Sequence, residues 1–161
     1  MRIQLRQFVN SIYYLRLCVL LCTLALSACG ATSALRPDNA KPVPQERIYL
    51  KLDQSSEDSA RVVIVRDFTE LYRSTYHQIF LDGKRIATLA NGEKLEIFLK
   101  PGDYVFGALP TMSADRSEPY SAGFAVYNLD QVLAPRKTYF YRVLIDVNAI
   151  TRMQRYLPDA L

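Results

Sequence analysis

Short runs in which apolar and polar residues alternate occupy most of the chain from residue 47 onward. Successive side chains of a strand point to opposite faces, so this period of two predicts half-buried β-strands. The strands are predicted over residues 47–52, 60–66, 76–81, 84–89, 94–99, 103–109, 121–129 and 138–147. The run 60–66 is apolar on both faces, which is typical of a strand in the middle of a sheet.

Turn sequences separate several of these runs. Asp82-Gly83 stands between two predicted strands, and an Asp-Gly pair is among the strongest hairpin signals because a type I′ turn needs positive φ at both central residues. Asn91-Gly92 and Pro101-Gly102 follow at similar spacing. Four short strands with three turns predict a meander.

Two segments lack a clear strand period. In residues 67–75, Asp67 and Glu70 have the spacing of a helix cap, so a short helical turn and a long loop both fit. Near the C-terminus, Asn148 precedes three apolar residues at helical spacing (Ile150, Met153 and Leu157), which predicts a short helix. Seven to eight strands with little helix predict an all-β antiparallel sandwich, with a small open barrel as the alternative.

The first 28 residues have a different pattern. They contain Arg2, Arg6 and Arg16, no acidic residue, and a ten-residue apolar run over residues 17–26. A helix that crosses a bilayer needs about 20 residues, so this run is too short to span but fits a signal-peptide core.

The apolar run ends in Leu26-Ser27-Ala28-Cys29, which resembles the lipobox of bacterial lipoproteins. The resemblance implies cleavage between Ala28 and Cys29 and a covalent lipid on the Cys29 sulfur, the only bound group expected. Gly30, in place of an aspartate, then favours sorting to the outer membrane of a two-membrane cell. An ordinary signal peptide and an uncleaved anchor are the alternatives.

Residues 30–46 are small and polar and contain three prolines. They predict a flexible, partly stiffened tether of 17 residues. The expected organisation is therefore a signal peptide over 1–28, a lipidated N-terminus and tether over 29–46, and a β-sandwich domain over 47–161.

Charge and cysteine content narrow the function classes. Without residues 1–28 the chain has 17 basic and 16 acidic residues and no basic run, which argues against nucleic-acid binding. Cys18 and Cys22 lie in the predicted signal peptide, so Cys29 is the only cysteine of the mature chain and no internal disulfide can form.

Candidate chemistry is sparse. His77 is the only histidine, and a lone histidine in a strand is more often structural or exposed than a ligand. The sequence has no Gly-x-Ser-x-Gly elbow, no phosphate-binding glycine loop and no His/Cys cluster in the mature part, so we assign no catalytic residue and no metal ligand. A small envelope hydrolase is the least favoured alternative.

Three tyrosines are candidates for binding. Tyr139 and Tyr141 alternate on one face of a predicted strand, and Tyr104 precedes Phe106 in the same way. Such aromatic strips suit glycans or peptides, but packing in the core of a sandwich explains the same spacing.

Four stretches in order, Arg61–Arg66, Phe80–Lys84, Leu99–Tyr104 and Lys137–Arg142, resemble a family of small bacterial lipoproteins of uncharacterised function. The resemblance implies a transthyretin-like or PEGA-like (immunoglobulin-like) sandwich that faces the periplasm or the cell surface, with no catalytic residues. The chain departs from the family at Arg136, where the family has glycine.

We therefore expect a membrane-anchored, non-catalytic binding or structural module whose partners are envelope proteins or glycans. The alternative is an accessory lipoprotein of a larger envelope assembly, such as a secretion system, with partners at the loop Pro110–Pro119.

Overall fold

The computed structural model describes residues 34–50, 56–114, 127–146 and 148–157. Within these ranges the chain forms nine strands and one short 3₁₀ helix, η1 (Gln45–Arg47). The strands are β1 (Lys41–Pro42), β2 (Ala60–Arg66), β3 (Tyr76–Leu81), β4 (Lys84–Leu89), β5 (Glu93–Leu99), β6 (Gly102–Thr111), β7 (Tyr127–Leu133), β8 (Thr138–Ile145) and β9 (Thr151–Arg155).

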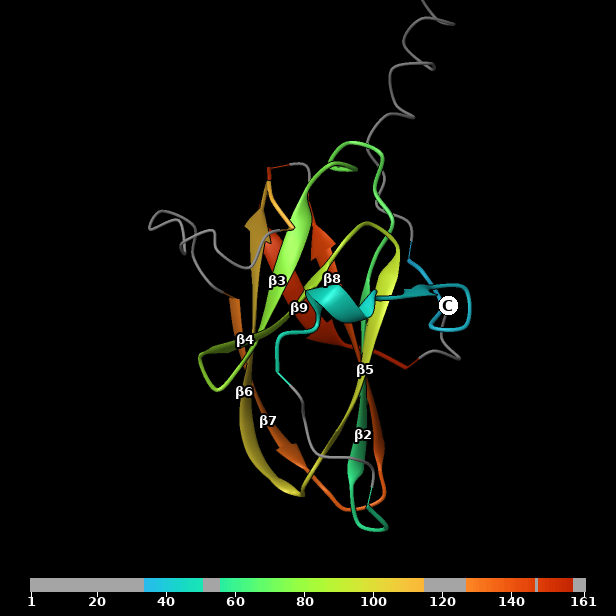
Figure 1. Ribbon diagram of the computed structural model, residues 1–161, viewed down its shortest axis with the longest axis vertical. Helices are drawn as coiled ribbons and strands as arrows, with labels where there is room; N and C mark the ends of the chain where they lie inside the picture. The colour runs from blue at the N-terminus through green and yellow to red at the C-terminus, as the bar shows by residue number, and fades with distance from the viewer. Residues whose placement is uncertain (1–33, 51–55, 115–126, 147, 158–161) are drawn as a thin grey trace, which may run out of the picture. The chain divides into compact units, whose positions relative to one another are not determined.

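The strands form two sheets that face each other (Figure 1). One sheet has the order β1-β5-β2-β8-β9 and the other has the order β4-β3-β6-β7. The predicted all-β sandwich is confirmed, and most strand pairs are antiparallel. Two pairs are parallel: β1 with β5, and β2 with β8. All four strands of the second sheet lie between β2 and β8 in the sequence. The connection from β2 to β8 therefore passes through the second sheet, and β8 then lies beside β2 in the same direction.

Of the predicted meander, only the hairpin between β3 and β4 forms. The rest of that prediction is wrong, because β5 pairs with β2 in the other sheet and β6 pairs with β3. The two turn residues of the hairpin, Asp82 and Gly83, have φ values of 49° and 74°, as a type I′ turn requires. Leu81 pairs with Lys84 at the start of the hairpin, and the register shifts by one residue between Ile79 and Phe80. Local turn chemistry therefore sets the position of this hairpin.

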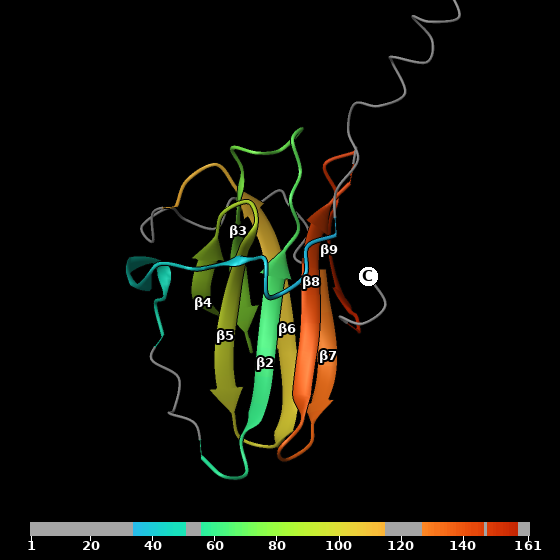
Figure 2. The same cartoon turned by 90° about the vertical axis from the view of Figure 1, so that its right-hand side faces the viewer.

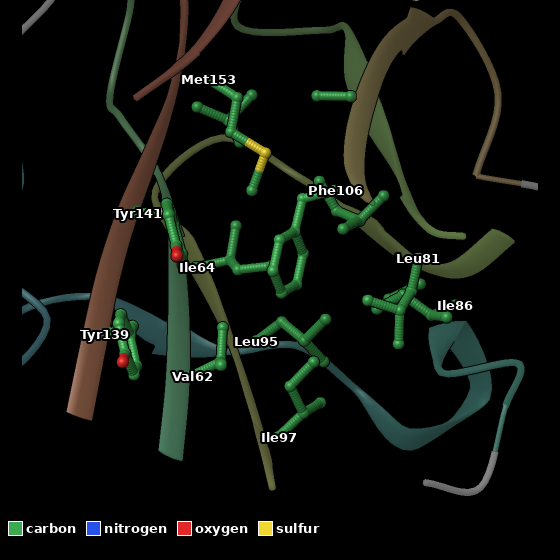
Figure 3. Close-up of a cluster of buried hydrophobic side chains, with 14 of the residues drawn as sticks. Val62, Ile64, Leu81, Ile86, Leu95, Ile97, Phe106, Tyr139, Tyr141 and Met153 are labelled. Atoms are coloured by element: carbon green, nitrogen blue, oxygen red, sulfur yellow. The ribbon is translucent and has the colours of Figure 1, made fainter. Parts of the chain in front are cut away.

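The core lies between the two sheets. Figure 3 shows Ile64, Phe106 and Tyr141 pointing toward one another, with Met153 beside them. The ring centroids of Phe106 and Tyr141 are 5.2 Å apart, which joins the two sheets through an aromatic contact. As the apolar residues on both faces of 60–66 predicted, β2 is a central strand with both of its faces buried.

The predicted flexible tether is wrong for residues 35–46. These residues cross the outer face of the five-stranded sheet, as Figure 2 shows in blue to cyan. Ala40 is buried against Val63 and Val65 of β2, with Leu35 and Phe140 packed beside them. Because both faces of β2 are apolar, its outer face needs a cover, and this segment supplies it.

The strand predicted over residues 47–52 is also wrong where it can be compared. Arg47 ends η1, and Ile48 makes only an isolated bridge to Ala87. Residues 51–52, 121–126 and 147 of predicted strands lie outside the described residues. The described part of the seventh predicted strand continues beyond residue 129, since β7 ends at Leu133.

The predicted C-terminal helix is wrong as well, because the residues in question form strand β9 against β8. Thr151 and Met153 are buried and alternate with exposed Arg152 and Gln154, so the burial period is two. Residues 67–75, for which a helical turn and a loop both fit, form a loop with turns.

Candidate functional site

One end of the sandwich contains the most elaborate polar structure among the described residues. We call it the entry end, because the first described part of the chain joins the sandwich there. Strands β2, β6 and β8 finish at this end, whereas β3 and β9 begin there. The loop Asp67–Thr75 connects β2 to β3 across it, and we call this segment the arch loop (Figure 1, green, top).

The chain is attached to the entry end through Asp67, the first residue after β2. The Leu35 N–H donates to Asp67 Oδ1 at 3.2 Å, and Arg142 Nε donates to Asp67 Oδ2 at 2.7 Å. The Arg142 Nη2 group donates to the same oxygen. Asp67 N–H also donates to the carbonyl oxygen of Val143 at 2.9 Å, so both the backbone and the side chain of Asp67 are held.

The Asp67 side chain is almost fully buried. Burial raises the pKa of Asp67, whereas the Arg142 guanidinium and the Leu35 N–H oppose that rise. A buried carboxylate needs such partners, and removal of one partner leaves the other charge uncompensated. Asp67 therefore couples three separate segments of the domain.

The guanidinium of Arg66 lies inside the entry end, and its residue is only 1% exposed. It donates to the carbonyl oxygen of Tyr72 at 3.0 Å, to Thr75 Oγ1 at 3.0 Å and to the carbonyl oxygen of Thr75. A longer bond of 3.5 Å reaches the carbonyl oxygen of Leu89. Burial lowers the pKa of Arg66 to about 10, so the group stays charged at neutral pH.

A second set of bonds fixes the arch loop from outside. The Asn91 side chain accepts from the Thr69 N–H at 3.0 Å and donates to the Thr69 carbonyl oxygen at 3.0 Å. Within the loop, Thr75 Oγ1 donates to the carbonyl oxygen of Tyr72 at 2.8 Å. The arch loop is therefore an ordered element, and it nevertheless exposes the apolar side chains of Phe68 and Leu71.

His77 is fully buried near Arg66. Its Nε2 atom lies 3.0 Å from Thr151 Oγ1, and its Nδ1 atom has no hydrogen-bond partner among the described residues. Burial, with a smaller contribution from the charge of Arg66, lowers the pKa of His77 to about 3. His77 is therefore neutral at physiological pH, and it is a structural residue away from solvent.

The candidate tyrosines do not form an exposed strip. Tyr139 and Tyr141 are buried in the core, where the Tyr139 hydroxyl accepts from Ala134 N–H at 2.8 Å. Burial raises the pKa of Tyr141 to about 12. Tyr104 is half-buried against the core, and its hydroxyl donates to the carbonyl oxygen of Lys100 at 3.0 Å. The three tyrosines therefore pack in or against the core, as the alternative interpretation of their spacing expects.

A shallow open depression of about 350 Å³ lies over β6 and β7. Asp103, Tyr104 and Val105 of β6 line it opposite Asp130, Gln131 and Val132 of β7. In the described ranges no three His, Cys, Asp or Glu side chains are grouped closely enough to hold a metal ion. The depression offers two carboxylates and two exposed valines, and none of the residues that line it is a buried polar residue.

The remaining predicted site residues fall outside the described part of the chain, including Ala28 and Cys29. In the predicted partner loop, Pro110 and Thr111 are the last residues of β6 and residues 115–119 are not described. Over the described ranges no helix has the length and apolar character to cross a membrane.

Arg136 lies in the turn between β7 and β8 and has a φ value of 59°, in the left-handed region that favours glycine. In comparisons with known proteins, no family model matches the chain and no curated protein matches it.

The sequence analysis missed Asp67, Arg66 and Arg142 as a group. A signal was present, since Arg66 ends the most apolar strand of the chain, Asp67 follows it directly, and such polar residues need partners. Their partners come from residues 35, 72, 75 and 142, and no local pattern links these positions.

Proposed function

We propose that this protein is a lipoprotein of the bacterial cell envelope, anchored by lipid chains on Cys29. Its sandwich serves as a non-catalytic binding or structural module. The observation that carries the proposal is Leu26-Ser27-Ala28-Cys29 at the end of a ten-residue apolar run that follows a basic segment. Two or more acyl chains make such an anchor stable, because each buried methylene contributes about 0.8 kcal/mol.

The packing of the N-terminal segment supports a short link between anchor and domain. Leu35 is bonded to Asp67, so only the chain between residues 29 and 35 separates the lipid from the sandwich. Extended chain advances about 3.5 Å per residue, which limits this link to about 20 Å. The proposed module is therefore held close to the bilayer, and Gly30 favours the outer membrane as that bilayer.

The environment of His77 supports a non-catalytic module. A Ser-His-Asp hydrolase needs an accessible imidazole with a nucleophile on one nitrogen and an acid on the other. His77 is inaccessible, its Nδ1 atom lacks a partner among the described residues, and its low pKa makes it a poor base.

A second candidate function is an accessory lipoprotein of a larger envelope assembly, as the family resemblance suggests. Phe68 and Leu71 are exposed on an ordered loop, and exposed apolar side chains of this kind favour a surface that contacts another molecule. Purification after gentle solubilisation separates the two functions, because an assembly subunit elutes with fixed partners and an independent module elutes alone.

The proposed anchor is tested by palmitate labelling and membrane flotation of the full chain in a bacterial host. We expect the wild type to incorporate label and float, and Cys29→Ala to lose both properties. Cys22→Ala is the matched control, because Cys22 lies in the predicted signal peptide and its loss leaves both properties intact. Equal labelling of wild type and Cys29→Ala would overturn the proposal.

A further inference from the structure

Exposed apolar side chains gather at the entry end. Eight large hydrophobic residues are exposed in the described part of the chain, and four of them are at this end: Phe68, Leu71, Met112 and Ile150. We call these four residues the apolar tip. Leu71, in the arch loop, is 57% exposed.

Strand register places the four residues at the same end of the sandwich. Met112 directly follows the end of β6, where Thr111 pairs with Tyr76 at the start of β3. Ile150 directly precedes β9, where Thr151 pairs with Ile145 at the end of β8. Phe68 and Leu71 lie in the arch loop that joins β2 to β3 above these strand ends (Figure 1).

The exposure of the arch loop is built into the fold. Arg66 holds Tyr72 and Thr75 from inside, and Asn91 holds Thr69 from the side. A loop fixed this firmly cannot fold its apolar side chains back onto the core. Leu71 and Phe68 are therefore presented to whatever adjoins this end of the domain.

The short chain between Cys29 and Leu35 indicates which surface lies next to the entry end. Leu35 bonds to Asp67, the residue next to Phe68, and at most about 20 Å of extended chain lies between Cys29 and Leu35. If Cys29 carries lipid, the bilayer surface is within that distance of Leu35, which is bonded to the residue before Phe68 of the apolar tip. Tethering at this range makes a weak contact effective, because the second contact becomes intramolecular.

We propose that the apolar tip rests in the lipid surface of the membrane that holds Cys29. The inference depends on the proposed lipid anchor and adds an orientation, with the entry end toward the bilayer. The charges of the arch loop suit this contact, because exposed Glu70 and Arg73 balance each other at a separation of 3.9 Å. The opposite end, with the depression over β6 and β7, then faces away from the bilayer.

The experiment uses the absence of tryptophan from the chain. Leu71→Trp introduces a single fluorophore at the tip. Val132→Trp is the matched control, because Val132 is 65% exposed and lies near the opposite end, beside Leu133, which pairs with Gly102. Each lipidated full-length variant is reconstituted into phosphatidylethanolamine–phosphatidylglycerol vesicles, with and without brominated acyl chains.

We expect the emission of Leu71→Trp to shift to shorter wavelength on vesicles and to be quenched by brominated lipid. Val132→Trp should show neither change. If both variants float with the vesicles but keep the emission of a solvent-exposed tryptophan, the proposed contact of the tip with lipid is overturned. The proposed lipid anchor is then unaffected. A shift of Leu71→Trp in native membranes but not on vesicles would assign the tip to a protein partner and would also overturn the contact with lipid.

Protein that carries no lipid and does not float would overturn the proposed function, and the inference with it. Lipid attachment is measured by mass on the same sample, so the two failures are distinguishable. A change in folding is detected by comparing urea unfolding of each variant with the wild type.

Discussion

The Leu35 N–H donates a hydrogen bond of 3.2 Å to the buried carboxylate of Asp67. This bond fixes where the chain joins the sandwich, and the Arg142 guanidinium on the same carboxylate ties it to β8. The segment that follows Leu35 then covers the outer face of β2 through Ala40. A stretch with tether-like composition is therefore part of the folded domain.

Asp67→Ala should destabilise the domain by about 3 kcal/mol, because it leaves the largely buried Arg142 without its partner and frees the Leu35 N–H. Urea unfolding measures the change. Asp58→Ala is the matched control, since the Asp58–Arg136 pair is exposed and is expected to contribute less than about 1 kcal/mol. Equal effects of the two substitutions would contradict the role assigned to Asp67.

Arg66→Met keeps an unbranched side chain and removes the donors that hold the arch loop. The carbonyl oxygens of Tyr72 and Thr75 then lose the Arg66 donors, with an expected cost of about 2–3 kcal/mol. Hydrogen exchange should accelerate first at residues 68–75. Arg61→Met removes an exposed arginine of the same strand, and it should leave exchange in the arch loop unchanged.

His77 should make stability fall as the pH is lowered. The pKa of His77 is about 3 in the folded state, and its ordinary value is 6.5. Below pH 6.5 the unfolded chain therefore binds a proton on this histidine, whereas the folded chain does not. The contribution is fully present above pH 6.5 and is lost towards pH 3, at a slope approaching about 1.4 kcal/mol per pH unit.

Unfolding free energies of the wild type and His77→Gln between pH 7 and 5 measure this slope, in a range where most carboxylates stay ionised. Glutamine retains a polar group beside Thr151 and cannot take up the proton. We expect the two curves to converge as the pH falls. Parallel curves would show that His77 is not buried in its neutral form.

Arg136→Gly should stabilise the domain by up to about 1 kcal/mol, because Arg136 has a φ value of 59° and only glycine adopts that conformation without strain. The exposed pair with Asp58 contributes too little to offset the gain. Thermal unfolding measures the difference. The neighbouring Lys137→Gly should not stabilise, and stabilisation by both substitutions would remove the conformational explanation.

The sequence predicts those parts of the fold that depend on neighbouring residues. The turn at Asp82-Gly83 specifies its own hairpin, and the apolar faces of residues 60–66 indicate a central strand before any partner is known. The parallel pairing of β2 with β8 depends on residues about 75 positions apart, so no local pattern contains it.

Two wrong predictions have specific physical causes. Ile150, Met153 and Leu157 have helical spacing, but Thr151 and Met153 bury one face of a strand against β8, and this pairing overrides the spacing. Residues 35–46 lack any period, since two of them pair with β5 and others cover β2. The doubly apolar face of β2 was the one sign that a cover was needed.

The candidate site also has one part that the sequence predicts and one part that it does not. The hydroxyl and ring positions of Tyr139 and Tyr141 follow the strand alternation that the sequence shows, but which face is the core depends on the second sheet. The arrangement of Arg66 and Asp67 could not be predicted, because their partners are backbone groups and side chains from three other segments.

The most direct test of the proposed anchor is the intact mass of the protein purified from bacterial membranes. We expect the mass of residues 29–161 plus a diacylglyceryl group and an amide-linked acyl chain, with fragments that place both on Cys29. A mass equal to all 161 residues, or to a cleaved chain without lipid, would contradict the anchor and the orientation that follows from it.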